Sequence, residues 1–291
     1  DIDLIDTLDV LIIELSSFQL EVLNNGIIDV GVILNISDDH MDRYNSFKKY
    51  FQAKEKLFSL SKINIINRDD EKLSELSYKA DLSFGISEPN SKKDYILKSD
   101  HSVSYIGKEN DFDIELKNLT LIGEHNKLNI MAAIVCLKSA FPKFDKFKIN
   151  KLVGVAHRLE WIKNKEGIDF YNDSKATNVN ATITALKSFD KKNIFLVAGG
   201  DSKNQVLEPL SKYLKQKVSA LYLIGQDSHI FEENFKLINS LKITNHKRLK
   251  DAVLSAYEDA SVGDIILLSP ACASYDMYSN YKERGLSLIH I

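Results

Sequence analysis

Short apolar runs that end in polar or small residues constrain the fold of this chain more than any other feature. Five such runs have the length and composition of buried parallel strands: residues 10–15, 30–36, 194–198, 220–224 and 265–268. Five stretches between them space their apolar residues as helices do: residues 46–60, 126–141, 178–189, 208–215 and 249–260. This alternation predicts an α/β fold with a mostly parallel sheet.

The middle of the chain follows a different pattern. Polar and apolar residues alternate on both sides of Gly107 between Tyr95 and Leu121, which predicts an antiparallel hairpin at a sheet edge. A helix-rich stretch ends near Gly154, and a fresh series of strands and helices begins after it. We therefore expect two domains, residues 1–154 and residues 155–291, each of ordinary domain size.

The composition excludes several classes of protein. The chain has 291 residues, of which 44% are hydrophobic and 27% charged, as in soluble globular proteins. Its net charge of −3 argues against bulk electrostatic binding to nucleic acid or to an anionic membrane. The sequence has no apolar run long enough for a membrane helix and no visible secretory leader. Cys136 and Cys272 show no pairing pattern, so we expect a cytoplasmic protein.

In open α/β sheets, ligands bind beyond the carboxyl ends of the strands. Polar or Gly/Ser-rich segments follow four of the predicted strands: residues 14–17, 35–40, 199–203 and 269–274. Ordinary turn chemistry accounts for each segment taken alone. Together the four segments indicate a site for charged, phosphate-bearing ligands.

The segment Asp38-Asp39-His40-Met41-Asp42 directly follows a predicted strand. Carboxylate and imidazole groups at a strand end suit a divalent metal, with Mg²⁺ favoured because phosphate oxygens can complete its shell. Glu14, at the end of the neighbouring predicted strand, adds a second carboxylate. The alternative is a solvated acidic turn in which Asp38 caps the next helix.

Lys54 occupies an unusual position in its predicted helix. It falls on the same helical face as Phe47, Phe51 and Phe58, inside an apolar stripe. Burial disfavours the charged form of lysine, and a neutral amine can react with CO₂ to give a carbamate. A carbamate would turn Lys54 into a carboxylate-like metal ligand. The alternative is a lysine that extends its ammonium group to solvent.

Two further segments carry features of anion sites. Residues 172–178 lead into a predicted helix, whose first N–H groups attract anions, and Lys175 adds a cation there. A plain capped helix would explain the Ser, Thr and Asn content without explaining the lysine. Gly199-Gly200 precedes Lys203 in a turn that resembles a phosphate or carboxylate cradle, although its spacing is not that of a P-loop.

Eight segments with distinctive residues follow one another along the chain: residues 14–21, 39–44, 53–54 with 57–58, 123–129, 157–160, 172–178, 199–203 and 269–274. In this order they resemble the D-glutamate-adding branch of the Mur ligase family across nearly the whole chain. The strings Asn-Asp-Ser-Lys-Ala-Thr-Asn and Ser-Pro-Ala-Cys-Ala-Ser are similar to that branch rather than to its siblings. The resemblance implies a central domain followed by a Rossmann-like C-terminal domain.

The resemblance also implies roles for individual residues. Glu14, His40 and a carbamylated Lys54 match the magnesium ligands of the family. Five residues match positions around the nucleotide: Asn126 and Asn129 near the adenine, and Arg158, Asp173 and Lys175. Five others match positions that hold D-glutamate: Thr177, Lys203, Ser274, Tyr275 and Tyr281. The family often has Leu and Phe where this chain has Tyr275 and Tyr281.

The activity implied is an ATP-dependent ligation in peptidoglycan synthesis. The γ-phosphate of ATP moves to the L-alanine carboxylate of UDP-N-acetylmuramoyl-L-alanine, and the amine of D-glutamate then attacks the acyl phosphate. Every participant except the amine is anionic, so magnesium and lysines offset the repulsion. We expect a monomer that uses these small molecules and binds neither nucleic acid nor membranes.

The chain departs from the family pattern at both ends. It lacks the P-loop pattern G-x-x-x-x-G-K-[ST] and a domain for the UDP-sugar, so we expect a fragment without ligase activity of its own. Within it, residues 155 to about 285 are expected to fold independently. Residues 286–291, after Glu283-Arg284-Gly285, do not resemble the continuing helix of the family.

Two other function classes fit part of this pattern. A non-catalytic nucleotide-binding fragment would keep the strand-end segments without turnover, and the missing P-loop favours it for the chain in isolation. A nicotinamide-dependent oxidoreductase is disfavoured because no G-x-G-x-x-G segment follows any predicted strand.

Overall fold

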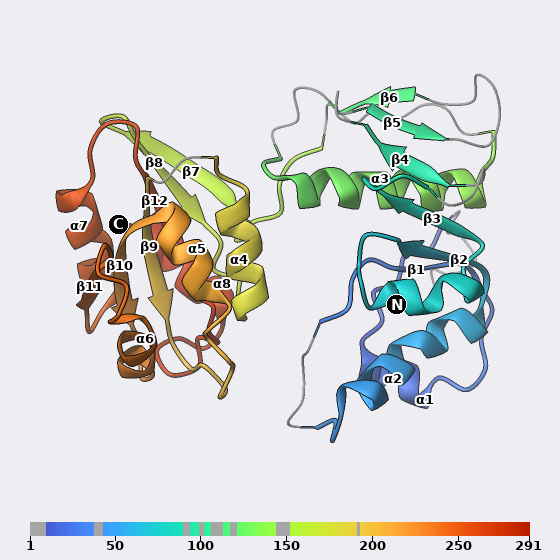
Figure 1. Ribbon diagram of the computed structural model, residues 1–291, viewed down its shortest axis with the longest axis horizontal. Coiled ribbons are helices and arrows are strands. Elements are labelled where there is room, and N and C mark those ends of the chain that lie inside the picture. The colour runs from blue at the N-terminus through green and yellow to red at the C-terminus, as the bar shows by residue number, and fades with distance from the viewer. Residues whose placement is uncertain are drawn as a thin grey trace. The chain divides into compact units, whose positions relative to one another are not determined.

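The computed structural model of the protein describes residues 10–37, 43–89, 94–98, 102–105, 113–116, 121–143, 152–190 and 193–291. The chain forms two compact units (Figure 1). The first unit comprises residues 1–118 and 126–149, and the second comprises residues 119–125 and 150–291. Both units are α/β with mostly parallel sheets, which confirms the predicted fold class. The domain limits at residues 154 and 155 stay a prediction.

A six-stranded sheet forms the centre of the first unit. In spatial order its strands are β1 (Ile28–Ile33), β2 (Ser61–Asn67), β3 (Leu82–Gly85), β4 (Tyr95–Leu97), β5 (Ser102–Tyr105) and β6 (Asp113–Glu115). Strands β1 to β4 pair in parallel, whereas β5 pairs antiparallel with both β4 and β6. The antiparallel pairing predicted for the middle of the chain is therefore confirmed, and its turn at Gly107 lies outside the described residues.

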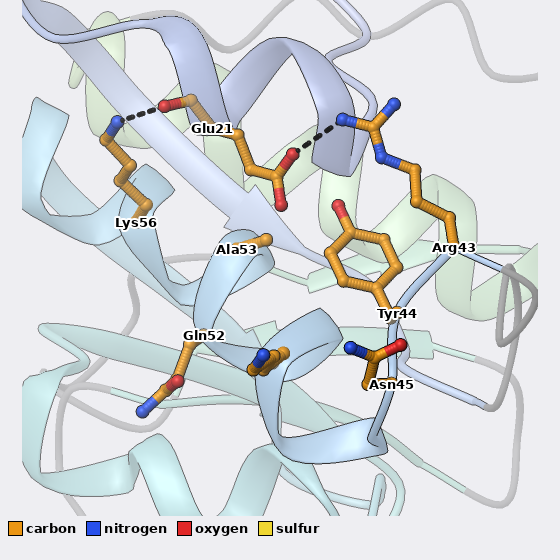
Figure 2. A pocket seen from close by; sticks show the side chains of 8 residues that line it. Glu21, Arg43, Tyr44, Asn45, Gln52, Ala53 and Lys56 are labelled. Atoms are coloured by element: carbon orange, nitrogen blue, oxygen red, sulfur yellow. Dashed lines mark hydrogen bonds and ion pairs between the residues drawn. The ribbon is translucent and has the colours of Figure 1, made fainter.

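The helices of the first unit are α1 (Ser17–Val22), α2 (Phe47–Leu60), the 3₁₀ helix η2 (Leu73–Lys79) and α3 (Glu124–Ala140). Side chains cap the first two. Ser16 and Gln19 form a reciprocal capping box at α1, and the hydroxyl of Ser46 accepts from the backbone N–H of Lys49 at α2. The Lys56 ammonium joins the two helices by donating to the backbone oxygen of Glu21 at 2.8 Å (Figure 2).

A hydrophobic core fixes which face of α2 turns inward. Tyr50, Ala53 and Phe58 are buried and pack with residues of β1, β2 and η2 in one cluster. Phe47 and Phe51 pack against this cluster while remaining partly exposed. The apolar stripe that predicted this helix therefore lies at the border of the core, and Lys54 is half-buried there.

The strand predicted over residues 10–15 was wrong. The segment has no strand conformation, and Ile12 is 90% exposed, with Leu11 and Ile13 also exposed. A strand forms only when a neighbouring strand accepts and donates its backbone hydrogen bonds. Among the described residues no strand pairs with this segment, and β1 pairs only with β2. Apolar composition alone is therefore not enough to form a strand, and these apolar side chains are exposed.

The second unit has a six-stranded open sheet. In spatial order its strands are β11 (Lys242–Asn245), β10 (Val218–Ile224), β9 (Ile194–Gly199), β12 (Ile265–Leu268), β8 (Ile168–Asn172) and β7 (Glu160–Lys165). All neighbours pair in parallel except β7, which is antiparallel to β8. The strands predicted over residues 194–198, 220–224 and 265–268 are confirmed as β9, β10 and β12. The β7–β8 hairpin was not predicted.

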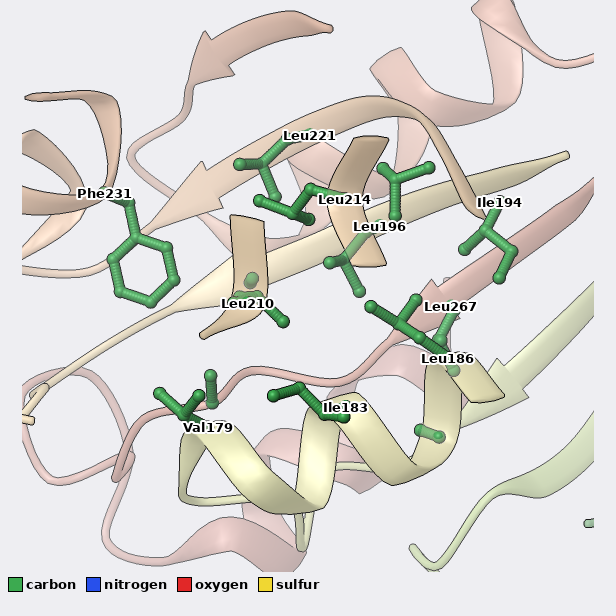
Figure 3. Packing of buried hydrophobic residues seen from close by; sticks show 14 of the residues in the cluster. Val179, Ile183, Leu186, Ile194, Leu196, Leu210, Leu214, Leu221, Phe231 and Leu267 are labelled. Atoms are coloured by element: carbon green, nitrogen blue, oxygen red, sulfur yellow. The ribbon is translucent and has the colours of Figure 1, made fainter. Parts of the chain in front are cut away.

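Helices cover both faces of this sheet. They are α4 (Val179–Lys187), α5 (Leu210–Lys217), α6 (Ser228–Phe235), α7 (Leu249–Asp259) and α8 (Tyr281–Ile289). Successive residues of β9 point to opposite faces, so Leu196 joins a core with α4, α5 and α6, shown in Figure 3. Val197 joins a second core with α7 and α8. This two-faced, mostly parallel arrangement is the Rossmann-like architecture expected.

Residues 286–289, in the stretch that does not resemble the family's continuing helix, nevertheless belong to a helix. Helix α8 runs from Tyr281 to Ile289, with Asn280 capping its first turn. Leu288 is only 3% exposed and belongs to the second core, against which Ile291 also packs. Burial of these two side chains holds the last turn in place, although the residues differ from the family pattern.

Candidate active site

Two of the predicted metal ligands share a cavity in the first unit. Glu14 and Lys54 line a cavity of about 300 Å³ together with Leu15, Ser16, Ser17, Gln19 and Tyr50. The Lys54 ammonium lies 5.9 Å from the centre of the Tyr50 ring, a distance at which a cation is attracted by the ring face. A carboxylate and a lysine thus face the same polar space between α1 and α2.

The donor set of this cavity suits magnesium under one condition. A lysine ammonium has no lone pair for a metal, whereas a carbamate on Lys54 would add oxygen donors to the Glu14 carboxylate, and magnesium prefers oxygen. The third predicted ligand, His40, lies outside the described residues. Among the residues that the structure describes, no three His, Cys, Asp or Glu side chains form a metal-binding group. The magnesium site stays a prediction.

The residues predicted to contact the nucleotide are divided between the units. Asn126 and Asn129 lie one turn apart on α3 in the first unit, the former half-buried and the latter exposed. Arg158, Asp173 and Lys175 lie in the second unit, where Arg158 is exposed.

Three loops meet at one edge of the second sheet. They follow β8, β9 and β12, which are adjacent strands in the order β9-β12-β8, so their carboxyl ends lie side by side. We name them the β8 loop (residues 173–178), the β9 loop (residues 200–207) and the β12 loop (residues 269–275). Asp201 and Ala273 join the second and third by mutual backbone hydrogen bonds of 3.1 and 2.9 Å.

The two glycines that end β9 permit this close approach. Gly199 has a φ of 112°, and a Cβ atom there would lie 2.1 Å from the backbone oxygen of Ile224. Gly200 has a φ of 134°, and its Cβ would lie 2.3 Å from the backbone oxygen of Ala273. Only glycine fits either position. The exposed Lys203 then follows, its backbone N–H donating to the Asp201 carboxylate at 3.0 Å.

Asp173 holds the β8 loop against the β12 loop. One oxygen of its carboxylate accepts from the backbone N–H of Leu159 at 3.0 Å, and the other accepts from the Ser269 hydroxyl at 2.7 Å. Burial raises the pKa of Asp173 to about 6, even though these hydrogen bonds and Arg158 oppose the shift.

This shifted carboxyl predicts a pH dependence of stability. The Asp173 carboxyl binds its proton more tightly in the folded chain than in the unfolded chain, where its pKa is 3.8. Its contribution to the free energy of unfolding therefore falls as pH rises from 3.8 to about 6, by up to about 3 kcal/mol. The free energy of unfolding, measured with urea at several pH values, should not show this fall in Asp173→Asn. The exposed Asp190→Asn variant is the control and should show the fall as the wild type does. The same pH dependence in the wild type and both variants would contradict the assignment to Asp173.

The structure brings two predicted site residues of the second unit, Lys175 and Tyr281, together. The Lys175 ammonium lies 5.6 Å from the centre of the Tyr281 ring, and the buried His157 ring packs edge-on against the same ring. Ser274 is only 3% exposed in the adjoining β12 loop, whereas Tyr275 is 71% exposed. Lys175 and Tyr281, predicted to contact different substrates, are thus neighbours.

Arg284 was missed as a site residue. It is only 1% exposed, and its guanidinium donates to the Ser174 hydroxyl and backbone oxygen at 3.1 and 2.9 Å. It also donates to the backbone oxygens of Cys272 and Ala273 at 3.0 and 3.3 Å. Burial lowers the pKa of Arg284 to about 10. Arg284 therefore links the β8 loop to the β12 loop through hydrogen bonds to both.

Gln205 is a second residue that sequence reasoning missed. Its side-chain oxygen accepts from the backbone N–H of Val179 at 3.0 Å. Its amide nitrogen lies 3.4 Å from the backbone oxygens of both Thr177 and Ala271, and 3.0 Å from that of Ser202. Gln205 thus links all three loops, and Thr177 takes part through its backbone.

Comparison with known families accounts for both units. The family model described as the Mur ligase middle domain matches residues 3–137. The model described as the Mur ligase, glutamate ligase domain matches residues 157–272. No helix among the described residues is long and apolar enough to cross a membrane.

Curated relatives match nearly the whole chain. It is 35% identical over 289 residues to the UDP-N-acetylmuramoylalanine–D-glutamate ligase of Pseudoalteromonas translucida, covering 95% of this chain and 61% of that protein. It is also 35% identical over 284 residues to the protein of the same name from Coxiella burnetii, covering 95% and 63%. The chain thus spans less than two thirds of the length of these relatives.

Solved structures share the fold. The UDP-N-acetylmuramate–alanine ligase of Thermotoga maritima matches with a TM-score of 0.63 at 18% identity, covering 88% of this chain and 58% of that chain. The MurF ligase of the same organism, in complex with ADP, matches with a TM-score of 0.64 at 18% identity, covering 87% and 61%. With one family's domains matched in both halves, and the folds in agreement, the chain belongs to the Mur ligase family.

Proposed function

We propose that this chain is the larger part of an ATP-dependent ligase that adds D-glutamate to UDP-N-acetylmuramoyl-L-alanine in peptidoglycan synthesis. The observation that carries the proposal is the meeting of three loops in the second unit, with Lys175, Lys203 and Ser274 on them. Relatives named for this activity are 35% identical over 95% of the chain, which supports the choice of substrates.

The residues of the three loops suit a dianionic amino acid. Lys203 follows a tight turn that Gly199 and Gly200 permit, so its ammonium can meet a carboxylate that approaches this edge. The hydroxyls of Thr177 and Ser274 belong to the neighbouring loops and are small donors that can orient the second carboxylate. In this proposal the three loops bind D-glutamate and orient it so that its amine faces the acyl phosphate.

The first unit would serve the phosphoryl transfer. We propose that Glu14, a carbamylated Lys54 and His40 hold magnesium, which would offset the charge of the phosphates and the acceptor carboxylate. Asn126 and Asn129 are proposed to contact the adenine, and Arg158, Asp173 and Lys175 the nucleotide. The buried Asp173 carboxyl holds the backbone of Leu159, next to Arg158, so it orients that arginine indirectly.

We test the amino-acid specificity on the 291-residue chain itself. Amide NMR spectra are recorded during titration with D-glutamate and, as the matched control, with L-glutamate. We expect D-glutamate to shift amide signals of the β8, β9 and β12 loops and L-glutamate to bind more weakly. Equal responses to the two enantiomers, or no shift in the three loops, would remove D-glutamate as the substrate.

Ligation itself is tested in a chimera. Residues 1–291 replace the matched part of the Pseudoalteromonas translucida ligase, so that the rest of the relative completes the enzyme. We expect release of phosphate that depends on both UDP-N-acetylmuramoyl-L-alanine and D-glutamate. A chimera that folds and binds both substrates but releases no phosphate would favour the non-catalytic nucleotide-binding alternative.

Lys203→Ala should weaken the binding of D-glutamate far more than that of ATP. Loss of one charge-assisted contact to a carboxylate is expected to raise the dissociation constant about tenfold or more. The measurement is the same NMR titration of the 291-residue chain, followed by ATP titration. The exposed Lys215→Ala on α5 is the control and should bind D-glutamate as the wild type does. Equal losses for both ligands would indicate general disruption of the unit.

The same proposal places the protein in the cytoplasm as a monomer. Both cysteines are free, with Cys272 buried and Cys136 half-buried, as expected of a protein in a reducing compartment. Size-exclusion chromatography with light scattering would measure the oligomeric state directly.

A further inference from the structure

A second cavity in the first unit is separate from the one that contains Glu14 and Lys54. It has a volume of about 460 Å³ and lies between the end of α1, the segment just before α2, and α2 itself (Figure 2). The eight residues that line it are Glu21, Arg43, Tyr44, Asn45, Lys49, Gln52, Ala53 and Lys56. None of them lines the other cavity. We call it the α1–α2 cavity.

The lining of the α1–α2 cavity carries a positive charge. Arg43, Lys49 and Lys56 contribute three positive charges and Glu21 one negative charge, so the net charge is +2. Lys56 donates to two neutral acceptors, the backbone oxygen of Glu21 at 2.8 Å and the side-chain oxygen of Asn24 at 3.3 Å. Within the part of the chain that the structure describes, neither Lys49 nor Lys56 forms a salt bridge. Among the described residues, these two cations therefore have no carboxylate partner.

Tyr44 adds an unsatisfied donor to the same cavity. Its side chain is only 5% exposed, and its ring is fixed by stacking on Phe18 at 5.9 Å and by an edge contact with Tyr50 at 5.3 Å. The hydroxyl is buried and has no hydrogen-bond partner among the described residues. Buried hydroxyls are almost always paired, so a phenol without a partner among the described residues, beside two lysines that form no salt bridge there, indicates that an acceptor is supplied by a ligand.

The ion pair between Arg43 and Glu21 lies next to the Tyr44 hydroxyl, and a ligand that reaches this hydroxyl must break it. Figure 2 shows the Tyr44 hydroxyl pointing toward the space between Glu21 and Arg43, whose side chains form an ion pair of 3.0 Å. The Arg43 and Glu21 side chains are 55% and 36% exposed, and exposed ion pairs contribute little stability. The Arg43 guanidinium rests 4.2 Å from the centre of the Phe18 ring, so it keeps its place when the Glu21 carboxylate swings away.

We propose that the α1–α2 cavity binds the phosphate or diphosphate group of a small molecule. Arg43, Lys49 and Lys56 surround the group, and the Tyr44 hydroxyl donates to one of its oxygens. A net charge of +2 matches a doubly charged phosphate better than a single carboxylate, and the arginine fork fits two of its oxygens. The volume falls in the range of small-molecule sites, about 300 to 1,000 Å³, so the ligand extends beyond the phosphate.

The test is calorimetric titration of the 291-residue chain with sodium pyrophosphate, in buffer of constant ionic strength. Lys49→Gln is expected to raise the dissociation constant about tenfold, whereas Lys48→Gln, on the same helix but outside the cavity, should change it less than about twofold. Tyr44→Phe keeps the ring and should weaken binding about fivefold. Glu21→Gln should strengthen binding, because it removes the competing carboxylate.

Three results would overturn the proposal. The first is no binding of pyrophosphate to the wild-type chain. The second is an equal effect of Lys49→Gln and Lys48→Gln, which would mean diffuse attraction to the helix. The third is loss of binding in Lys54→Gln with no effect of Lys49→Gln, which would place the anion in the other cavity. Lys49 is exposed and its variant should fold, so the outcome is decided even if Tyr44→Phe is unstable. The proposal does not rest on the proposed ligase activity.

Discussion

Lys54→Ala is expected to lower the rate of ligation by the chimeric enzyme about a thousandfold, the loss typical of removing one preorganised electrostatic group from an active site. Lys54 shares a cavity with Glu14, and its half-buried ammonium lies over the Tyr50 ring. Only as a carbamate would it add oxygen donors to that cavity. Because the donors then belong to a small carboxylate-like group, a short carboxylic acid should replace them in the Lys54→Ala variant.

The measurement is phosphate release that depends on both substrates, with and without high concentrations of acetate. Substantial recovery of activity in acetate would support a carbamate, since an ammonium that served only as a cation would not be replaced by an anion. Lys48→Ala is the matched control, because Lys48 lies on the same helix, is exposed and lines neither cavity. If the Lys54→Ala enzyme turns over as the wild type does without added acid, Lys54 has no part in the mechanism.

Local signals made much of the fold predictable. Helix α2 begins at Phe47 and ends at Leu60 because Ser46 caps its first turn and apolar residues recur at helical spacing, and both features are readable in the sequence. Strands β9, β10 and β12 were equally readable, because strands buried on both faces are continuous apolar runs.

Two errors in the predicted strands have opposite causes. The apolar run of residues 10–15 has the composition of a strand, but a strand needs a hydrogen-bonded neighbour, and composition carries no information about neighbours. Strand β7 was missed for the opposite reason. It is polar and lies at the sheet edge, so its pairing with β8 stabilises it without leaving a hydrophobic pattern.

The candidate site also has a part that the sequence could predict and a part that it could not. The β9 and β12 loops could be located because polar or glycine-rich segments follow the strands predicted over residues 194–198 and 265–268. The β8 loop was located only as the start of a predicted helix. The residues that join the loops could not be located, since arginine and glutamine are ordinarily surface residues. Arg284 is buried and Gln205 half-buried only because the loops fold around them, which is a tertiary property.

Arg284→Met is expected to lower the free energy of unfolding of the 291-residue chain by about 3 kcal/mol, because several buried acceptors lose their donor at once. Those acceptors are the Ser174 hydroxyl and backbone oxygen and the backbone oxygens of Cys272 and Ala273. Methionine fills much of the same volume, so the loss of stability reflects lost hydrogen bonds rather than a cavity.

Urea unfolding measures the free energy of unfolding of the two proteins. Arg248→Met, which removes an exposed arginine paired with Asp251, is the control and should leave stability unchanged.

The same substitution separates a positioning role from a purely structural one. The Arg284 guanidinium fixes the β8 loop, which carries Lys175 and Thr177, relative to the β12 loop, which carries Ser274. Arg284→Met should therefore weaken D-glutamate binding about tenfold even under conditions where the variant is fully folded. Arg284→Lys keeps the charge and up to three donors, so it should regain part of both losses. If the Met variant is destabilised as expected but binds D-glutamate with wild-type affinity, the guanidinium stabilises the unit without positioning its loops. The acceptors of the Arg284 guanidinium come from two loops, and a single ammonium cannot reach both loops as the planar guanidinium does. The Arg284→Lys variant should therefore regain less D-glutamate affinity than stability.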